Sequence, residues 1–239
     1  MSMGIFIASM VIGLWAGHLG WMLSLREITY TSPMLYVHII LQGYLYTGLF
    51  ITAHDSMHGG ISANRTVNTL FGRVGLWLFA AFPYRRMFTK HMEHHHHPGT
   101  EDDPDFSTHQ NPIRWFFSFF FSYVTPVQIL TMALLFNIGH LVFGFPVANL
   151  ILFWVIPAFL GTFQLFHFGT YAPHRLPHTP EMAPHNSRSQ KRNHLWAMLS
   201  CWFFGYHWEH HQYPGTPWWR LHGKKDLTVP YNSDGTERI

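Results

Sequence analysis

The stretch HMEHHHHPGT, residues 91–100, places five histidines within ten residues. Successive residues of an α-helix are about 100° apart, so positions i, i+3 and i+4 lie within an arc of about 100°. His91, His94 and His95 therefore share one face of a predicted helix. Three imidazoles on one face indicate a metal site, and a fold that brings further ligands to it.

The other two histidines of the stretch, His96 and His97, fall on the far side of this helix. Pro98 and Gly99 predict its end, because proline breaks the hydrogen-bond ladder and glycine favours a C-terminal cap. The acidic run EDDPD, residues 101–105, follows within reach of that far side. We expect His96 and His97 to support the site or end the helix, without binding metal.

Two further clusters repeat this spacing. HDSMH, residues 54–58, has histidines at i and i+4, and HWEHH, residues 207–211, has them at i, i+3 and i+4. Eight imidazoles exceed the three or four protein ligands of one zinc ion, so the clusters predict two metal ions. The predicted ligands are His54, His58, His91, His94, His95, His207, His210 and His211.

Carboxylates lie close to the clusters in the sequence. Glu93 and Glu209 come two residues after the first histidine of their clusters and point nearly to the opposite side of the helix. Carboxylates beside metal-binding histidines commonly accept a hydrogen bond from the other ring nitrogen and so set the tautomer. We expect this role for Asp55, Glu93, Asp102, Asp103, Asp105 and Glu209.

The composition is not that of a soluble protein. Of 239 residues, 48% are hydrophobic and 11% are charged, whereas an ordinary soluble domain has about 25% charged residues. The apolar residues fall in blocks of about twenty, the length that spans a bilayer as a helix. The single cysteine, Cys201, excludes an internal disulfide. We predict one membrane-embedded domain over residues 1–239, with a flexible polar tail from Lys224 to Ile239.

Four apolar blocks are long enough to cross the membrane. They are Gly4–Leu23, Pro33–Ala53, Thr125–Phe145 and Val147–Phe168. Shorter blocks better suit interfacial or re-entrant helices; these are Thr69–Phe82, Pro112–Tyr123 and Leu195–Tyr206. The predicted fold is an all-α integral membrane protein with four transmembrane helices and a cytoplasmic helical cap that carries the histidine-rich metal site.

Basic residues set the predicted orientation. Arg26 alone lies in the loop after the first span, while the other fourteen lysines and arginines lie on the opposite side. Positive charge accumulates on the cytoplasmic side of membrane proteins. We therefore expect both termini and the histidine clusters on the cytoplasmic face, and the net charge of +3 requires no nucleic-acid partner.

Seventeen of the twenty histidines lie on that face or at the span ends that reach it. The exceptions, His18, His38 and His140, fall within predicted spans, and we expect each to be buried and hydrogen-bonded. Imidazole suits iron, zinc, copper and nickel alike. A redox pair of irons suits the attack of O₂ on an unactivated C–H bond of a lipid, which no side chain performs alone.

The extended motifs resemble a known family. A His-x-x-x-His motif followed by two His-x-x-His-His motifs is similar to the membrane di-iron superfamily of fatty-acyl desaturases, alkane hydroxylases and carotenoid-oxygenating enzymes. More closely, the sequence resembles the bacterial β-carotene ketolases of the CrtW type. The motifs that carry this resemblance lie within residues 54–221 and are HDSMHG, HHHHPGT with DPDF, FHFGTYAPHR and HWEHHQYPGTPWWRL.

The resemblance implies a reaction and its cofactors. A ketolase of this type oxidises C4 of the β-ionone ring to a ketone with two irons, O₂ and electrons from an external donor. Two hydroxylations at one carbon give a geminal diol, which loses water. β-Carotene would become echinenone and then canthaxanthin.

The resemblance also implies a ninth metal ligand. In the superfamily a further histidine lies at the cytoplasmic end of the last span in a His-aromatic-Gly context, which here is His167 in FHFG. His174 in APHR is the competing candidate, but it lies past the predicted span among prolines, and we place it around the metals instead of on them. The alternative for His167 is a histidine that caps helix carbonyls.

A carotenoid is long, rigid and insoluble, so we expect it to enter sideways from the bilayer. Aromatic side chains near the metal face could hold its ring, although such residues are more often ordinary core. The candidates are Phe82, Phe88, Phe106, Phe166, Phe168 and Tyr171.

The electron donor is expected to be a separate, ferredoxin-like protein, because the chain has no CxxC and no Gly-rich dinucleotide motif. Four basic residues could dock an acidic partner, although the positive-inside tendency explains them equally well. They are Arg85, Arg86, Lys191 and Arg192.

Two alternatives stay open. A fatty-acyl desaturase, or a carotenoid or lipid hydroxylase that stops at the alcohol, shares the histidine pattern. A histidine-rich metal transporter is more distant, because transporters generally build their sites near the bilayer midplane, whereas these clusters lie at span ends.

Overall fold

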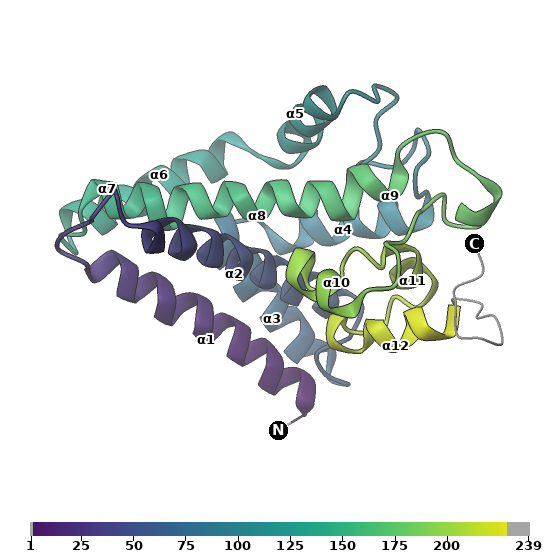
Figure 1. Ribbon diagram of the computed structural model, residues 1–239, viewed down its shortest axis with the longest axis horizontal. Coiled ribbons are helices and arrows are strands. Elements are labelled where there is room, and N and C mark those ends of the chain that lie inside the picture. Colours follow the sequence, from purple (N-terminus) through teal and green to yellow (C-terminus); the bar gives the residue numbers. More distant parts are fainter. Residues whose placement is uncertain (1, 229–239) are drawn as a thin grey trace.

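The structure is a computed structural model that describes residues 2–228, and these residues form helices and connecting loops without a β-strand (Figure 1). The α-helices are α1 (Met3–Ser24), α2 (Pro33–Met57), α3 (Arg65–Ala80), α4 (Tyr84–His96), α5 (Pro112–Tyr123), α6 (Pro126–Leu141), α7 (Val147–Leu150), α8 (Ile156–Phe166), α9 (Ala172–His174), α10 (His194–Cys201), α11 (His207–Gln212) and α12 (Trp218–Thr228). The predicted tail is corrected in part. Lys224–Thr228 continues α12, and residues 229–239 lie outside the described residues.

Three helical segments are long and apolar enough to cross a membrane, namely Met3–Ser24, Pro33–Met57 and Val147–His174. The third span predicted from the sequence corresponds to α6, which has only 16 residues. It reaches spanning length only together with α5, and the two helices are bent by 85° at their junction. The described chain therefore has three candidate spans, or four if the bent pair is one span.

The long helices lie side by side, so the molecule has two opposite ends (Figure 1). One end holds the short connections from α1 to α2 and from α6 to α7, while the other end carries α10, α11 and α12. Small residues allow the helices to approach closely, as is common in membrane proteins. At Gly75 of α3, for example, a Cβ atom would lie 2.8 Å from the carbonyl oxygen of Leu49 in α2.

The segment Val147–His174 is one helical run with two π-helical turns, Ile151–Val155 and His167–Tyr171. It is longer than the predicted span, which ends at Phe168. A π-turn rearranges the regular hydrogen-bond ladder of a helix, so the chain continues helically past Pro173. The extension brings His174 to the end of the molecule where the histidine clusters lie.

The three histidines that the sequence places within spans, His18, His38 and His140, are hydrogen-bonded, but they are not buried. His18 contacts Gln42, and its Nε2 lies 3.1 Å from Nδ1 of His38. Both rings are half-buried. His140 is exposed, and its Nδ1 lies 3.0 Å from the carbonyl oxygen of Phe145. Local partners therefore satisfy these rings without the full burial that was expected.

Candidate metal centre

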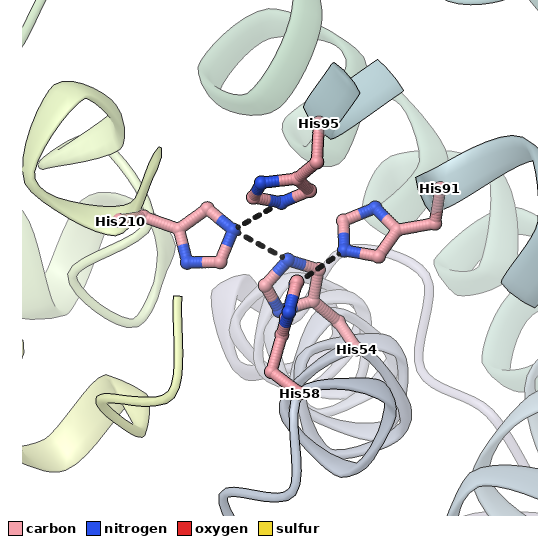
Figure 2. Close-up of side chains that lie close together, drawn as sticks. All are labelled: His54, His58, His91, His95 and His210. Carbon is pink, nitrogen blue, oxygen red and sulfur yellow. Dashed lines mark hydrogen bonds between the residues drawn. The ribbon is translucent and has the colours of Figure 1, made fainter. Parts of the chain in front are cut away.

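Five histidines form the first group, and each offers a ring nitrogen within 4.8 Å of the others (Figure 2). His54 comes from α2 and His58 directly follows this helix, while α4 supplies His91 and His95 and α11 supplies His210. The Nε2 atom of His210 lies 3.1 Å from Nε2 of His54 and 2.9 Å from Nε2 of His95. The Nε2 atoms of His58 and His91 are 2.6 Å apart.

Four histidines form the second group, which adjoins the first. They are His94 of α4, His174 of α9, and His207 and His211 of α11, all buried and with ring nitrogens within 4.8 Å of one another. The ring of His211 lies beside that of His95 in the first group, with centroids 4.4 Å apart. Helices α4 and α11 contribute to both groups, because the i, i+3, i+4 spacing points three rings of each helix to the same side.

Both groups have the donor chemistry and spacing for metal ions. Imidazole nitrogens bind a metal ion such as zinc at about 2.0–2.1 Å, so two of them on one ion lie about 3.0–3.4 Å apart, depending on the coordination angle. The shortest nitrogen separations in the groups are 2.6–3.1 Å. In the second group the Nε2 atoms of His94 and His174 are also buried without a hydrogen-bond partner, which a bound ion can satisfy. The nine histidines therefore fit two adjacent metal ions.

The protonation state also suits metal binding. Burial lowers the pKa of His58 from 6.5 to about 4. Burial and then the neighbouring histidines lower the pKa of His91 and His210 well below the usual value. Imidazole binds metals in its neutral form, so rings held neutral at pH 7 are ready to serve as ligands.

Two carboxylates fix the orientation of ligand rings. The Nδ1 atom of His94 lies 2.9 and 3.0 Å from the two oxygens of Asp103. Burial lowers the pKa of His94, but the Asp103 carboxylate outweighs burial and the pKa is raised. Asp55 accepts from Nδ1 of His54 at 3.0 Å and from the backbone N–H of Trp218 at 2.7 Å. In both pairs the proton is held on Nδ1, so Nε2 is free for a metal.

The other predicted carboxylates lie elsewhere. Glu93 and Asp102 are exposed. Glu209 is buried, but it pairs with Lys225 at 3.2 Å and not with a histidine. Asp105 accepts a hydrogen bond from the Tyr123 hydroxyl, and its Oδ2 lies 4.0 Å from Nδ1 of a ring that Asp103 already holds. Glu93, Asp102 and Glu209 thus make no ring contact, because their helix or loop positions turn them away.

The end of the opening stretch follows the helical projection. Helix α4 ends at His96, and both His96 and His97 are exposed and lie outside the two groups. Gly99 adopts a φ of 66°, a conformation that favours glycine. Its N–H donates to Asp103 at 2.8 Å, so the turn after α4 places this carboxylate behind the metal-facing rings.

The structure brings a different histidine from the predicted one to the two groups. His167 is exposed, lies beside Phe168 and Tyr171, and belongs to neither group among the described residues. His174 belongs to the second group in its place. The reason is the length and phase of the helix, since it continues two turns past His167 through a π-turn. His174 is the competing candidate for the ninth ligand in the sequence, but its place among prolines past the predicted span favours His167.

A cavity of about 500 Å³ reaches the two groups from the side of the helices. His54, His91, His94 and His207 line it where it meets the metal centre, and mostly apolar side chains line the rest. Among the latter are Phe79, Phe82, Phe119, Phe120, Met132, Phe136, Trp154 and Phe159. Lining residues Ile129 of α6 and Phe159 of α8 are also 57% and 45% exposed. The cavity therefore extends to the outer surface of these helices.

Of the predicted aromatic contacts only Phe82 lines the cavity. Phe166 and Tyr171 pack against Trp115, Phe168 packs on the main core, and Phe88 lies beside Tyr84. Phe106 contacts Trp115. An aromatic residue that is close to a histidine motif in the sequence need not point its side chain into the cavity. The cavity residues of α5, α6 and α8 were missed because an apolar span does not reveal which face lines a cavity.

Comparison with known proteins identifies the family. The sequence matches the fatty acid desaturase family model over residues 31–132 and 125–230. It is 42% identical to a β-carotene ketolase of a Paracoccus species over 74% of each chain.

For two algal relatives, the matched region is a smaller share of the relative's own length. The zeaxanthin 4-ketolase of Chlamydomonas reinhardtii is 40% identical over 88% of this chain and 48% of that protein. The β-carotene 4-ketolase 3 of Haematococcus lacustris is 41% identical over 77% of this chain and 60% of that protein. The chain belongs to the fatty acid desaturase family and, within it, groups with the β-carotene ketolases.

Proposed function

We propose that the protein oxidises C4 of the β-ionone ring of β-carotene to a ketone. The observation that carries this proposal is the cavity, which joins the two histidine groups to the outer surface of α6 and α8. Its volume of about 500 Å³ falls in the usual range of ligand pockets. Such a cavity suits one ring of a carotenoid with the start of its polyene. The identity of about 40% to named carotenoid ketolases supports the same substrate class.

The cofactor we propose is a pair of iron ions held by the nine histidines of the two groups. Bound iron would supply the activation of O₂, with electrons from an external donor. The chain itself positions the ring and excludes water from the cavity. Asp55 and Asp103 hold the protons of their histidines on Nδ1. Two hydroxylations at C4 give a geminal diol, which loses one water to leave the ketone and needs no further oxidant.

The apolar helices and the family make this a membrane protein. We propose a single domain with four spans, in which α5 and α6 together provide the third. The histidine end would then face the cytoplasm with both termini, in agreement with the positive charges on that side.

Electrons would come from an acidic, ferredoxin-like partner that docks on this face. Arg85 and Lys191 are exposed there. Arg86 and Arg192 are also exposed, although the first donates to the carbonyl of Ser122 and the second pairs with Asp226.

Expression in cells that accumulate β-carotene tests the proposed activity. Pigment analysis is expected to show echinenone and canthaxanthin with the natural chain, and unchanged carotene when His94 and His210 are both replaced by alanine. His96→Ala is the matched control, because His96 lies outside both groups, and it is expected to keep ketolase activity. Unchanged carotene with the natural chain would refute the ketolase, and 4-hydroxy products alone would indicate a hydroxylase.

Metal analysis tests the centre independently. Two irons per purified chain are expected. A single labile zinc that survives replacement of both His94 and His210 would instead favour the metal-transporter alternative.

A further inference from the structure

Asp105 is a carboxylate in the wall of a largely apolar cavity. It lies in the loop between α4 and α5 and lines the cavity together with His91 and His94. Burying a carboxylate is costly unless its oxygens receive hydrogen bonds. The Tyr123 hydroxyl donates to Oδ1 of Asp105. Among the described residues, no group donates to Oδ2.

Asp105 is not needed to orient His94. The Nδ1 atom of His94 carries one proton, and both oxygens of Asp103 lie within 3.0 Å of this atom. Oδ2 of Asp105 is 4.0 Å away from it, beyond hydrogen-bond distance. The side chain of Asp103 is fully buried, whereas that of Asp105 keeps 14% exposure. Asp105 therefore has an oxygen available to a molecule in the cavity, close to the metal centre.

The chemistry of the two oxidation steps indicates what this oxygen binds. An unsubstituted β-ionone ring is a hydrocarbon and offers no hydrogen-bond donor. After one oxidation the ring carries a hydroxyl at C4, which does. We propose, on the basis of the proposed function, that Asp105 accepts a hydrogen bond from this C4 hydroxyl and keeps the alcohol in place for the second oxidation. Tyr123 holds Oδ1, which leaves Oδ2 to accept from the hydroxyl.

This contact decides whether the enzyme releases an alcohol or a ketone. An alcohol in a largely apolar cavity loses its hydrogen bonds to water, and without a strong acceptor beside it the alcohol returns readily to the membrane interface. A hydrogen bond to an ionised carboxylate is stronger than one between neutral groups. Asp105 thus favours the singly oxidised ring over the unsubstituted ring as an occupant of the site.

The test compares the two steps separately in the full-length enzyme. Asp105→Leu keeps a similar volume and removes both oxygens. With 4-hydroxy-β-carotene as substrate, kcat/KM is expected to fall about tenfold or more, because a hydrogen bond to a charged group is lost. With β-carotene, the first hydroxylation is expected to change less than about threefold. Cells that make the variant are expected to accumulate 4-hydroxy pigments in place of ketones.

Two readouts do not depend on turnover. The purified variant is expected to keep its metal content but to retain less 4-hydroxy-β-carotene through purification, measured by absorbance. Asp102→Asn is the matched control for the loop, because Asp102 is exposed, and it is expected to behave as the natural chain. Asp105→Asn keeps the size and a weaker acceptor, so it is expected to raise the ratio of alcohol to ketone by a smaller factor.

An equal loss on both substrates together with loss of metal would overturn the inference, since Asp105 would then belong to the metal centre. An unchanged ratio of alcohol to ketone in both variants would overturn it as well. If Asp105→Leu does not accumulate as folded protein, the ratio measured for Asp105→Asn decides alone. Failure of the natural chain to form any ketone refutes the proposed function instead.

Discussion

His167 and His174 are seven residues apart on one helical run, yet only His174 lies in a histidine group. We expect His174→Ala to lower the metal content from about two ions to about one per chain, because the second group keeps only three imidazoles. His167→Ala is the matched control and is expected to keep both ions. Metal analysis of the purified variants measures this. Loss of metal in His167→Ala alone would contradict the assignment.

The histidines whose pKa is lowered by burial make the metal-free protein sensitive to acid. Unfolded His58 takes up a proton below about pH 6.5, but in the folded protein burial lowers its pKa to about 4. Between these values the unfolded state binds more protons, so the free energy of unfolding falls as the pH falls. One such histidine contributes a slope of at most about 1.4 kcal/mol per pH unit. Below about pH 4 its contribution levels off.

Thermal unfolding of chelator-treated protein in detergent, between pH 7 and pH 4, measures this dependence. His58→Asn is expected to reduce the slope, whereas His96→Ala is expected to leave it unchanged because His96 is exposed. A melting temperature that does not fall across this interval would contradict the neutral state of the buried rings.

At the scale of elements, helix α11 depends on α12 for its position. Lys225 of α12 lies 3.2 Å from Glu209 of α11, and both side chains are buried. Removing one partner of a buried ion pair costs about 3–5 kcal/mol. Lys225→Met is therefore expected to destabilise the protein and to lower the metal content, because α11 carries three of the proposed ligands. Thermal unfolding and metal analysis measure both effects.

Two further variants separate this effect from loss of a positive charge. Lys191→Ala removes an exposed charge and is expected to change neither property. Adding Glu209→Gln to Lys225→Met removes the uncompensated buried charge, so the pair of substitutions is expected to recover part of the stability. No recovery would mean that the ion pair does not hold α11 in place.

The sequence predicts the arrangement of side chains on a helix where helix geometry alone determines it. The i, i+3, i+4 spacing depends only on helix geometry, so it predicted which faces of α4 and α11 meet, and that His96 and His97 would point away. Prediction from the sequence failed where distant contacts decide. The helical run continues past Pro173 because a π-turn precedes it. The ring of Phe88 turns to Tyr84 because of local packing that no motif encodes.

At the scale of the whole molecule, the proposed orientation predicts on which side of the membrane each loop lies. Thr31 lies in the loop between α1 and α2, and Glu101 lies beyond α4 at the histidine end, and both are exposed. The natural cysteine, Cys201, is buried, so it gives little background. A membrane-impermeant thiol reagent applied to intact cells is expected to label Thr31→Cys but not Glu101→Cys. Labelling of both would contradict the proposed orientation.

More of the overall architecture than of the cavity could be predicted from the sequence. Long apolar blocks and family membership indicated a helical membrane protein, and the comparisons confirm the family. The bend of 85° between α5 and α6 has no such signal, because it depends on how both helices pack. The cavity walls depend on that bend, so the residues that line the cavity could not be predicted from the sequence.

The distribution of the histidines along the chain also sets an order in time. The first group joins His54 to His210, which are 156 residues apart, and the second group includes His207 and His211. A ribosome makes the chain from its N-terminus, so α2 and α4 already exist while α11 has not yet been synthesised. Neither group can be completed until residue 211 has emerged. Loading with metal would then be a late event of biosynthesis, and a nascent chain exposes six of the nine proposed ligand histidines until then.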